Sequence, residues 1–334
     1  MKFGIEEDLL CVDPATGRRV ETGDPGTGSE ADEAEPDSFI FRTGAEALEA
    51  LLEDRRALGA LAADGGAIAT GFGLVPALSP AADPCAPSTG REGGALRIHL
   101  PVPTPEEGVQ VMNHLRRWMP VLMALGANSP LWNTADTGYA SWRTLRNRTL
   151  PVHGIPPHFF GARDYTERVD RLLESPGIDT QDHVGWGARL SPLRGSLEVR
   201  AIDMQLTAGE SVLFALLVRS LAVEALHRSP TPDGITPEES DAATWHAARH
   251  GVEGDLVGLP SCERSSPSAL AHLMFDTVED HLIGFGDAAY VSAGLRELLD
   301  SGNGAARQRV AFEHGGIARV VEFAGAELVR ETTW

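Results

Sequence analysis

Cysteine is scarce in this chain. Only Cys11, Cys85 and Cys262 occur in 334 residues, and none has the spacing of a CxxC motif or of a Cys/His metal site. An odd number of widely separated thiols indicates neither a disulfide framework nor a zinc knuckle. We therefore expect free thiols in a reducing compartment, the cytoplasm.

Positive charge is scarce as well, with 28 Lys and Arg against 48 Asp and Glu and a formal net charge of −20. This balance argues against binding of nucleic acid or of an anionic membrane through bulk electrostatics, and an anionic substrate would need local arginines or metal ions. Long apolar runs are also missing. The most apolar segment, 211–226, contains Arg219 and Glu224, so it predicts a buried helix and no membrane span. The first residues resemble a strand and lack the pattern of a signal peptide.

Helix start signals are frequent. Thr43, Thr104 and Thr207 each stand three residues before a glutamate, which is the spacing of a capping box, and apolar residues at helical spacing follow. Further helices are predicted at about 164–176, 237–250, 268–284, 291–300 and 303–313. Two segments rich in Gly, Pro or acidic residues, 16–37 and 79–94, predict flexible loops within one domain that spans residues 1–334.

Three short β-compatible segments, 2–13, 94–103 and 195–204, carry polar residues at alternate positions. Because side chains alternate between the faces of a strand, Glu6 and Asp8 share a face and Glu7 points the other way. If the three strands belong to one sheet, one face gathers Glu6, Asp8, Arg97, His99, Glu198 and Arg200. Such a group is costly unless cations compensate the carboxylates, which suits Mg2+ and arginines in a phosphoryl-transfer site. The alternative is that each charged pair is only the solvated face of an antiparallel strand.

The segment 122–159 is too polar and too aromatic for a simple connection. It follows an apolar helix that breaks at Gly126 and holds two tryptophans with Asn128, Ser129, Asp136, Tyr139, Ser141, Arg143, Arg146 and Arg148. Clustered arginines beside Ser and Tyr suit recognition of a small molecule that carries a carboxylate. The alternative is an ordered loop whose arginines only offset a very acidic chain.

Five motifs occur in an order and spacing that resemble the type 2 glutamate–cysteine ligases, also called carboxylate–amine ligases. They are GIEED at the N-terminus, LxALxANSPxWxxxDTGYASxR at 122–143, LEVRxxD at 197–203, WxAARHG at 245–251 and GxGAARQR at 302–309. The resemblance runs from about residue 2 to about residue 325. It implies an α+β fold of the glutamine-synthetase-like catalytic type, in which a curved, mostly antiparallel sheet lines the active site and helices cover its outer side.

The resemblance also implies a reaction, in which ATP phosphorylates a substrate carboxylate, typically that of glutamate, and an amine attacks the acyl phosphate to form an amide. The implied Mg2+ ligands are Glu6, Asp8, His99 and Glu198. The contacts expected for the nucleotide are Arg97, His99, Arg189 and Arg200, and the catalytic residues are Arg143 and Arg200. The contacts expected for the amino-acid substrate are Asn128, Ser129, Tyr139, Ser141, Arg143 and Arg146. The partners would be that amino acid and an amine acceptor, and a homo-oligomer is compatible with the sequence.

Several positions depart from the family pattern. Arg97 replaces the first histidine of an HxH strand, Asp8 replaces a glutamate, and Gly187 replaces an acid. The segment 38–44 also lacks an expected acidic ligand, so at least one metal position is in question and the substrate is expected to differ from that of the parent activity. Two other functions stay open: a transferase that uses an already activated acyl donor without ATP, and a binding protein on the same scaffold.

Overall fold

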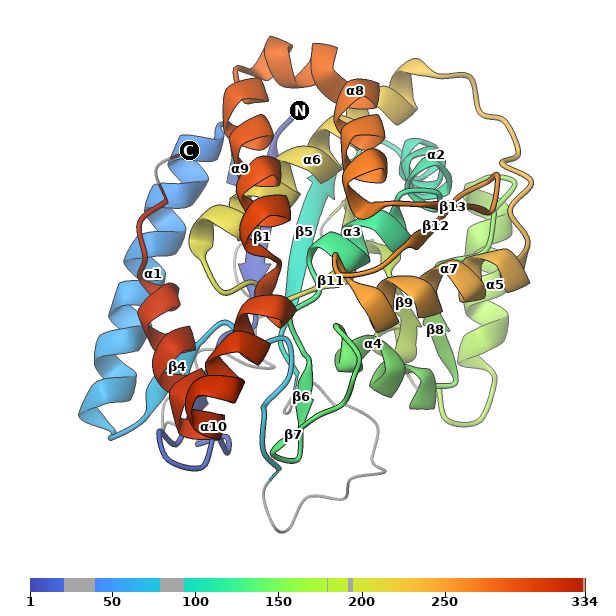
Figure 1. The fold of residues 1–334 in the computed structure, drawn as a ribbon. Coiled ribbons are helices and arrows are strands. Elements are labelled where there is room, and N and C mark those ends of the chain that lie inside the picture. The colour runs from blue at the N-terminus through green and yellow to red at the C-terminus, as the bar shows by residue number, and fades with distance from the viewer. Residues whose placement is uncertain (21–39, 79–92, 179, 192–194, 333) are drawn as a thin grey trace.

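A five-stranded sheet forms the centre of the computed structural model, which describes residues 1–20, 40–78, 93–178, 180–191, 195–332 and 334. The strand order is β10-β11-β5-β1-β3, and every neighbouring pair is antiparallel. The strands are β1 (Phe3–Glu7), β3 (Ile40–Phe41), β5 (Ala95–Pro101), β10 (Ala188–Ser191) and β11 (Ser196–Asp203). The three segments predicted to share a sheet therefore contribute its central strands, β11, β5 and β1 (Figure 1).

The strand register separates polar from apolar side chains. Glu6 pairs with Arg97 across β1 and β5, and Glu198 pairs with His99 across β11 and β5. The opposite face is apolar and belongs to the main core through Phe3, Ile5, Leu96, Ile98, Leu100, Leu197 and Val199. The predicted alternation is confirmed along β1, along β5 and along β11 as far as Val199.

Helices cover the apolar face of the sheet. The central one, α6 (Ala208–His227), contacts β1 and β5 and also the helices around it. Those helices are α1 (Gly44–Asp64), α2 (Pro105–Leu115), α8 (Pro267–Phe285) and α9 (Ala288–Ser301), while α3 (Met119–Leu125) contacts β11. Because α6 is apolar on most of its circumference, it is buried over most of its length. Within the described residues, no helix combines the length and apolarity needed to cross a membrane.

Threonine caps begin these helices as predicted. Thr43 and Thr207 form complete capping boxes with the glutamates three residues on, and Thr104 accepts a hydrogen bond from the backbone N–H of Glu107. A further box at Thr236 begins α7 (Pro237–His250), although only the helix and not its cap was predicted there. Each box satisfies backbone N–H groups that a helix end leaves without partners.

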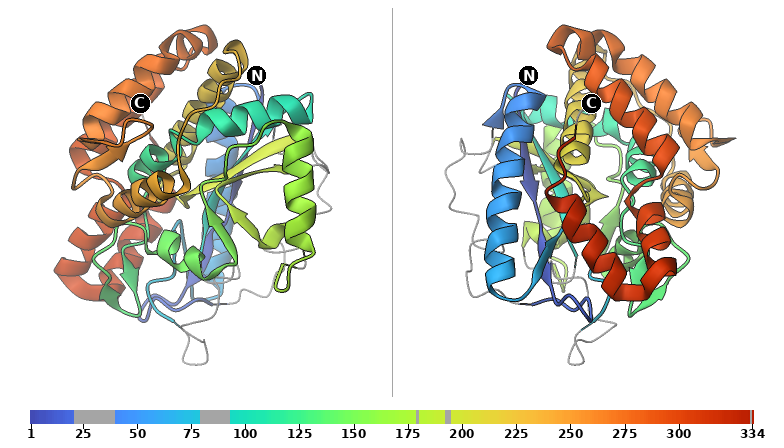
Figure 2. Two further views of the ribbon diagram at one scale, coloured as in Figure 1. Left: turned by 90° about the vertical axis from the view of Figure 1, so that its right-hand side faces the viewer. Right: turned by 60° about the vertical axis from the view of Figure 1, so that its left-hand side comes forward.

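Smaller elements complete the chain. They are β2 (Leu10–Val12), β4 (Ile68–Thr70), β6 (Leu131–Trp132), β7 (Ala135–Asp136), α4 (Trp142–Arg146), η3 (Asn147–Thr149), β8 (Val152–Gly154), α5 (Ala162–Leu173), η4 (Gln181–His183), β9 (Val184–Trp186), β12 (Leu256–Gly258), β13 (Glu263–Ser265) and α10 (Gly304–Leu328). The last helix bends at Gly315 and Gly316 and then runs beside α1 (Figure 2). Most of the two predicted loops, 16–37 and 79–94, lies outside the described residues, which leave out 21–39 and 79–92.

One irregularity interrupts the pairing of β11 with β5. Val199 pairs with Ile98 and Ile202 pairs with Leu96, so β11 contains one more residue than its partner between these positions. This is a β-bulge, and it shifts the alternation of the side chains that follow. As a result Asp203 lies on the same face as Glu198, whereas an unbroken strand would turn it toward the apolar face.

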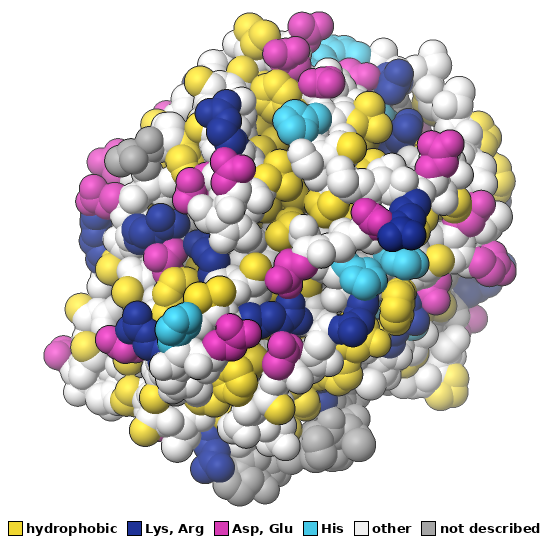
Figure 3. All heavy atoms as spheres, in the orientation of Figure 1, with side chains coloured by type: hydrophobic (Ala, Val, Ile, Leu, Met, Phe, Trp, Pro, Cys, Tyr) yellow, Lys and Arg dark blue, Asp and Glu magenta, His cyan; other side chains and the backbone are white. Residues whose placement is uncertain are grey.

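The surface shows charges of both signs. On the face drawn in Figure 3, acidic and basic side chains are interspersed and do not separate into one large patch of a single sign. This face therefore carries no large patch of acidic side chains. A local group of arginines can still produce a positive site, because neighbouring charges dominate the potential at short range.

Candidate active site

The polar face of the sheet holds a compact group of charges at β1 and β5. Arg97 donates through Nη2 to Asp8 Oδ2 at 2.9 Å and through Nη1 to Glu6, while His99 Nε2 lies 3.1 Å from the second oxygen of Glu6. Burial raises the pKa of Asp8, and the positive charge of Arg97 acts in the opposite direction. One guanidinium thus bridges the two carboxylates that the sequence assigned to this face.

Glu198 extends the group across β5 to the neighbouring strand. Arg189 Nε donates to Glu198 Oε2 at 3.0 Å, and Arg200 Nη1 lies 3.8 Å from Glu198 Oε1. Two buried atoms, Glu198 Oε1 and His99 Nδ1, have no hydrogen-bond partner among the described residues. Burial and the nearby positive charge of Arg189 lower the pKa of Arg200 to about 10. An anion bound at this position would offset the repulsion between these arginines.

Glu7 occupies the opposite face, as predicted. Both of its carboxylate oxygens accept hydrogen bonds from Arg55, at 2.8 and 2.7 Å, and Arg55 is completely buried. The same guanidinium donates to the backbone carbonyl of Leu206 at 2.8 Å. The third carboxylate of GIEED therefore takes part in a structural ion pair beneath the sheet.

A pocket of about 420 Å³ lies beside the bulge of β11 at Arg200 and Ala201, where α3, α4, α7, β8 and β9 meet. Arg143 and Arg200 line it, and its apolar walls include Met119, Met123 and Trp186. Among the described residues that line the pocket, Asp241 is the one acid, and Arg148 contacts it. The pocket therefore combines a positive lining with apolar walls, a combination that suits an organic anion.

Asp203, just beyond the bulge, organises the loop beside this pocket. Its Oδ1 accepts hydrogen bonds from Arg143 Nε at 2.7 Å and from Ser141 Oγ at 3.0 Å. Its Oδ2 accepts hydrogen bonds from Ser129 Oγ at 2.7 Å and from the backbone N–H of Asn128 at 2.8 Å. The sequence contained this carboxylate in LEVRxxD, but no role was assigned to it. The signal that could have indicated a role for Asp203 was its position in the motif, three residues after Arg200.

The six residues expected to bind substrate have different surroundings. Arg143 lines the pocket, whereas Asn128, Ser129 and Ser141 are buried and make hydrogen bonds to other parts of the protein. Asn128 Nδ2, for example, donates to the carbonyls of Gly71 and Met204 at 2.7 and 2.6 Å. For these three residues, substrate contact stays a prediction, and the visible contacts support the loop that carries Arg143.

Tyr139 and Arg146 lie in aromatic contacts outside the described lining of the pocket. The ring of Tyr139 packs against Trp142 and Trp245, with centroid distances of 5.3 and 6.3 Å. Arg146 stacks over the ring of Trp132 at 4.3 Å. The tryptophan that lines the pocket is Trp186 at the end of β9, outside the segment 122–159.

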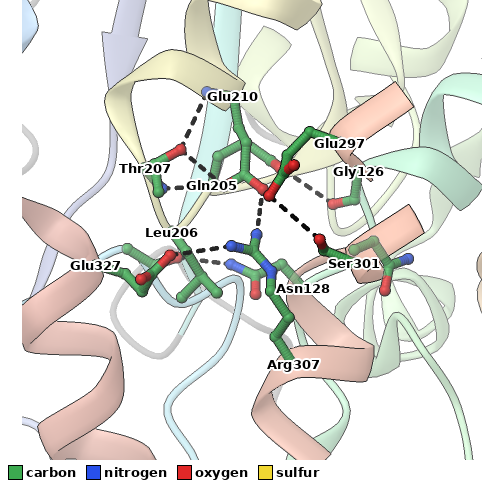
Figure 4. A network of polar contacts seen from close by, with 12 residues as sticks. Gly126, Asn128, Gln205, Leu206, Thr207, Glu210, Glu297, Ser301, Arg307 and Glu327 are labelled. Atoms are coloured by element: carbon green, nitrogen blue, oxygen red, sulfur yellow. Dashed lines mark hydrogen bonds and ion pairs between the residues drawn. The ribbon is translucent and has the colours of Figure 1, made fainter. Parts of the chain in front are cut away.

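The GxGAARQR motif at the start of α10 contacts the loop that contains Asn128 (Figure 4). Gln308 Nε2 donates to Asn128 Oδ1 at 2.6 Å. Arg307 contacts Glu210, the capping glutamate of α6, and donates to Glu327 at 3.0 Å. The motif therefore connects α6, α10 and the loop. Its polar residues Arg307 and Gln308 are needed to hold these three parts together.

Comparison with known proteins identifies the family. The sequence profile of the glutamate–cysteine ligase family 2 (GCS2) matches residues 2–323. The chain belongs to this family. A GCS2 relative from Mycolicibacterium vanbaalenii, named "Putative glutamate--cysteine ligase 2-2", is 34% identical over 338 residues and covers 93% of each chain. A relative from Nocardia farcinica, with a similar name, is 41% identical over 237 residues, or 69% of this chain and 62% of its own.

A solved structure of the glutamate–cysteine ligase of Francisella tularensis in complex with AMP has the same fold. The TM-score is 0.68 over 99% of this chain and 89% of the other, at 14% sequence identity. The expected α+β fold of a GCS2 protein, with an antiparallel sheet covered by helices, is confirmed. AMP is a ligand of the Francisella protein.

The four expected metal ligands of this GCS2 protein do not fit a divalent ion as they are arranged. Arg97 already bridges Glu6 and Asp8, and Arg189 holds one oxygen of Glu198. Within the described parts of the chain, no three His, Cys, Asp or Glu side chains converge as a metal site would require. A magnesium ion needs near-octahedral oxygen ligands at about 2.0–2.1 Å. A positively charged arginine, which cannot act as a metal ligand, lies among these carboxylates instead.

Proposed function

We propose that this protein is an ATP-dependent ligase that joins a small acid of the glutamate type to an amine through an acyl phosphate. The observation that carries the proposal is the position of Arg200. Its guanidinium lies near Glu198 on the polar face of the sheet and also lines the pocket. One side chain thus borders two regions, which suits transfer of a phosphoryl group from a nucleotide on the sheet to an acid in the pocket.

The chemistry requires positive charge between two anions. In the first step a carboxylate oxygen attacks the γ-phosphorus of ATP and ADP leaves. In the second step the amine nitrogen attacks the acyl carbon, phosphate leaves, and the nitrogen loses a proton. Arg143, Arg189 and Arg200 supply fixed positive charge near this path, so the charge that develops in the transition state is stabilised without reorganisation.

Arg143 is the best candidate to hold the acid. Asp203 accepts its Nε hydrogen bond and its Nη2 donates to the carbonyl of Ala201 at 3.3 Å, so the guanidinium is fixed before a ligand arrives. A preorganised guanidinium binds a carboxylate in fork geometry at little entropic cost. The hydroxyls and amide around Asp203 then act as positioning groups for this arginine.

A transferase that needs no ATP is the second candidate. The observation in its favour is the poor fit of Glu6, Asp8, His99 and Glu198 to a divalent metal, because phosphoryl transfer from ATP usually uses metal-bound phosphates. The two functions differ in one measurable product, since only the ligase releases ADP.

The test is therefore release of ADP over a panel of acids and amines, together with the shift in melting temperature that ATP causes. We expect ATP to stabilise the protein and ADP to appear only when acid and amine are both present. Arg200→Lys keeps the charge but loses the fork, and we expect a loss of about 10²-fold in kcat/KM with an unchanged melting temperature.

The matched control is Arg163→Lys on α5, where the arginine is exposed and pairs with Glu167. It should keep full activity. Absence of both stabilisation by ATP and release of ADP would refute the ligase, and amide formation from an activated acyl donor alone would favour the transferase.

A further inference from the structure

Arg97 is held in place by the register of the sheet. It lies directly opposite Glu6 in the β1–β5 ladder, and its guanidinium reaches both Glu6 and Asp8. Its side chain is 29% exposed, against 23% for Glu6 and 20% for Asp8, so the three groups form a partly buried unit. The backbone pairing of β1 with β5 thus places a positive charge between the carboxylates of Glu6 and Asp8.

The charges around Glu6, Asp8 and Glu198 already balance. Three carboxylates, those of Glu6, Asp8 and Glu198, face three arginines, Arg97, Arg189 and Arg200. Carboxylates that share a site need such compensation, which a metal ion or a cationic side chain can give. A divalent ion between Glu6 and Asp8 would have to occupy the place of the Arg97 nitrogens, so the two cations exclude each other.

We propose that Arg97 is a built-in cation that takes the place of a divalent metal ion between Glu6 and Asp8. The guanidinium cannot dissociate, unlike a metal ion, and it carries one positive charge where magnesium would carry two. Charge compensation at this pair is then independent of the concentration of divalent ions. The proposal concerns these three side chains and does not depend on the reaction proposed above.

The test is a titration of the full chain with Mn2+ alone, without nucleotide or substrate, followed by calorimetry and by the electron paramagnetic resonance of free Mn2+. We expect the isotherm of the wild type to be the same as that of Glu6→Gln. Arg97→Ala uncovers the two carboxylates, and we expect it to bind one additional Mn2+ per chain at least about tenfold more tightly. The double variant Arg97→Ala with Glu6→Gln should lose this gain.

Arg319→Ala is the matched control, because it removes an exposed arginine that pairs with Glu322 and lowers the net charge equally. It should bind Mn2+ as the wild type does. Arg97→His provides a second variant that restores a metal-binding side chain at the same position, and it should gain Mn2+ affinity even if Arg97→Ala does not fold.

Two results would overturn the proposal. One is tight binding of Mn2+ to the wild type that Glu6→Gln or Asp8→Asn abolishes, and the other is no gain of affinity in folded variants of Arg97. Because nucleotide is absent from these titrations, failure of the ligase function would leave both results interpretable.

Discussion

Arg55 and Arg56 are neighbours in α1 with opposite surroundings. Arg55 is fully buried and holds both oxygens of Glu7, whereas Arg56 is half exposed and pairs with Glu331 near the C-terminus. Removal of one partner of a buried pair leaves the other charge without compensation, at a cost of about 3–5 kcal/mol, whereas exposed pairs contribute less than about 1 kcal/mol. At the scale of single residues, burial decides the value of an ion pair.

The first prediction follows from this contrast. Arg55→Met should lower the free energy of unfolding by about 3 kcal/mol or more, and Arg56→Met should change it by less than about 0.5 kcal/mol. Urea unfolding measures both. Equal effects of the two substitutions would contradict the assignment of Glu7 to a structural ion pair.

The second prediction concerns His114 in α2. Burial lowers its pKa to about 4, and Arg117 and Arg228 act in the same direction. Between about pH 4 and pH 6.5 the unfolded chain binds the proton that the folded chain does not, so stability falls as the pH falls through this window. His114→Gln should therefore lose less stability than the wild type between pH 7 and pH 5, by about 2 kcal/mol.

Thermal unfolding at both pH values measures this difference. The control is His272→Gln on α8, which removes an exposed imidazole. We expect it to keep the pH dependence of the wild type. A wild-type dependence in His114→Gln would show that this buried imidazole is not the group responsible.

At the scale of elements, the contact between α10 and the loop that contains Asn128 is unusually close. A Cβ atom on Gly304 would lie 2.0 Å from Asn128 Oδ1 and 2.4 Å from its Cγ. The glycine at this position thus allows the first turn of α10 to approach the buried amide of Asn128. Gly59 in α1 is the opposite case, since a Cβ there would meet nothing within 4 Å.

The third prediction compares these two glycines. Gly304→Ala should destabilise the protein by about 1–3 kcal/mol, because the loop or the helix must move. Gly59→Ala should stabilise it by about 0.5–1 kcal/mol, because alanine favours a helix interior. Chemical unfolding of the two variants gives the comparison, and stabilisation by Gly304→Ala would contradict the close contact.

The elements differ in how far the sequence could predict them. Helix starts carry local signals, such as the box at Thr207, and strand alternation correctly separated Glu6 and Asp8 from Glu7. The bulge in β11 carries no such signal, because it depends on pairing with β5. The role of Asp203 was missed for this reason.

The site residues show the same division. Residues on the sheet, such as Arg97 and Glu198, were placed on one face because strand geometry alone decides the side. In the loop, composition could not show that Ser141 faces Asp203 or that Tyr139 faces Trp245, since both contacts join segments far apart in sequence. A polar residue in a loop can bind substrate or hold the loop, and only the tertiary contacts distinguish the two.

At the scale of the whole molecule, one continuous core connects the sheet and most helices. It includes Phe3 in β1, Val218 in α6 and Leu298 in α9. A shared core favours unfolding as one unit, and the single domain stays a prediction. Two smaller clusters, around Val320 and around Leu328, include residues of α10 itself.

The fourth prediction is a single calorimetric transition. Its enthalpy should be about 230 kcal/mol near 60 °C, from about 0.7 kcal/mol per residue, and it should match the van't Hoff enthalpy. Differential scanning calorimetry measures both quantities. Two resolved transitions would refute the single domain.

The bulge of β11 means that the number of residues between Val199 and Ile202 decides which face of the sheet the following side chains occupy. Pairing of the same residues with β5 without the bulge would shift the register after Val199 by one residue and would rotate Asp203 to the apolar side. Four hydrogen bonds to the loop would then lose their acceptor, and a carboxylate would enter the core without a partner. Insertions in the surface loops are better tolerated, because they do not change which side chains face the core. A transplant of this site onto another sheet must therefore copy the extra residue of the β11 bulge together with the side chains.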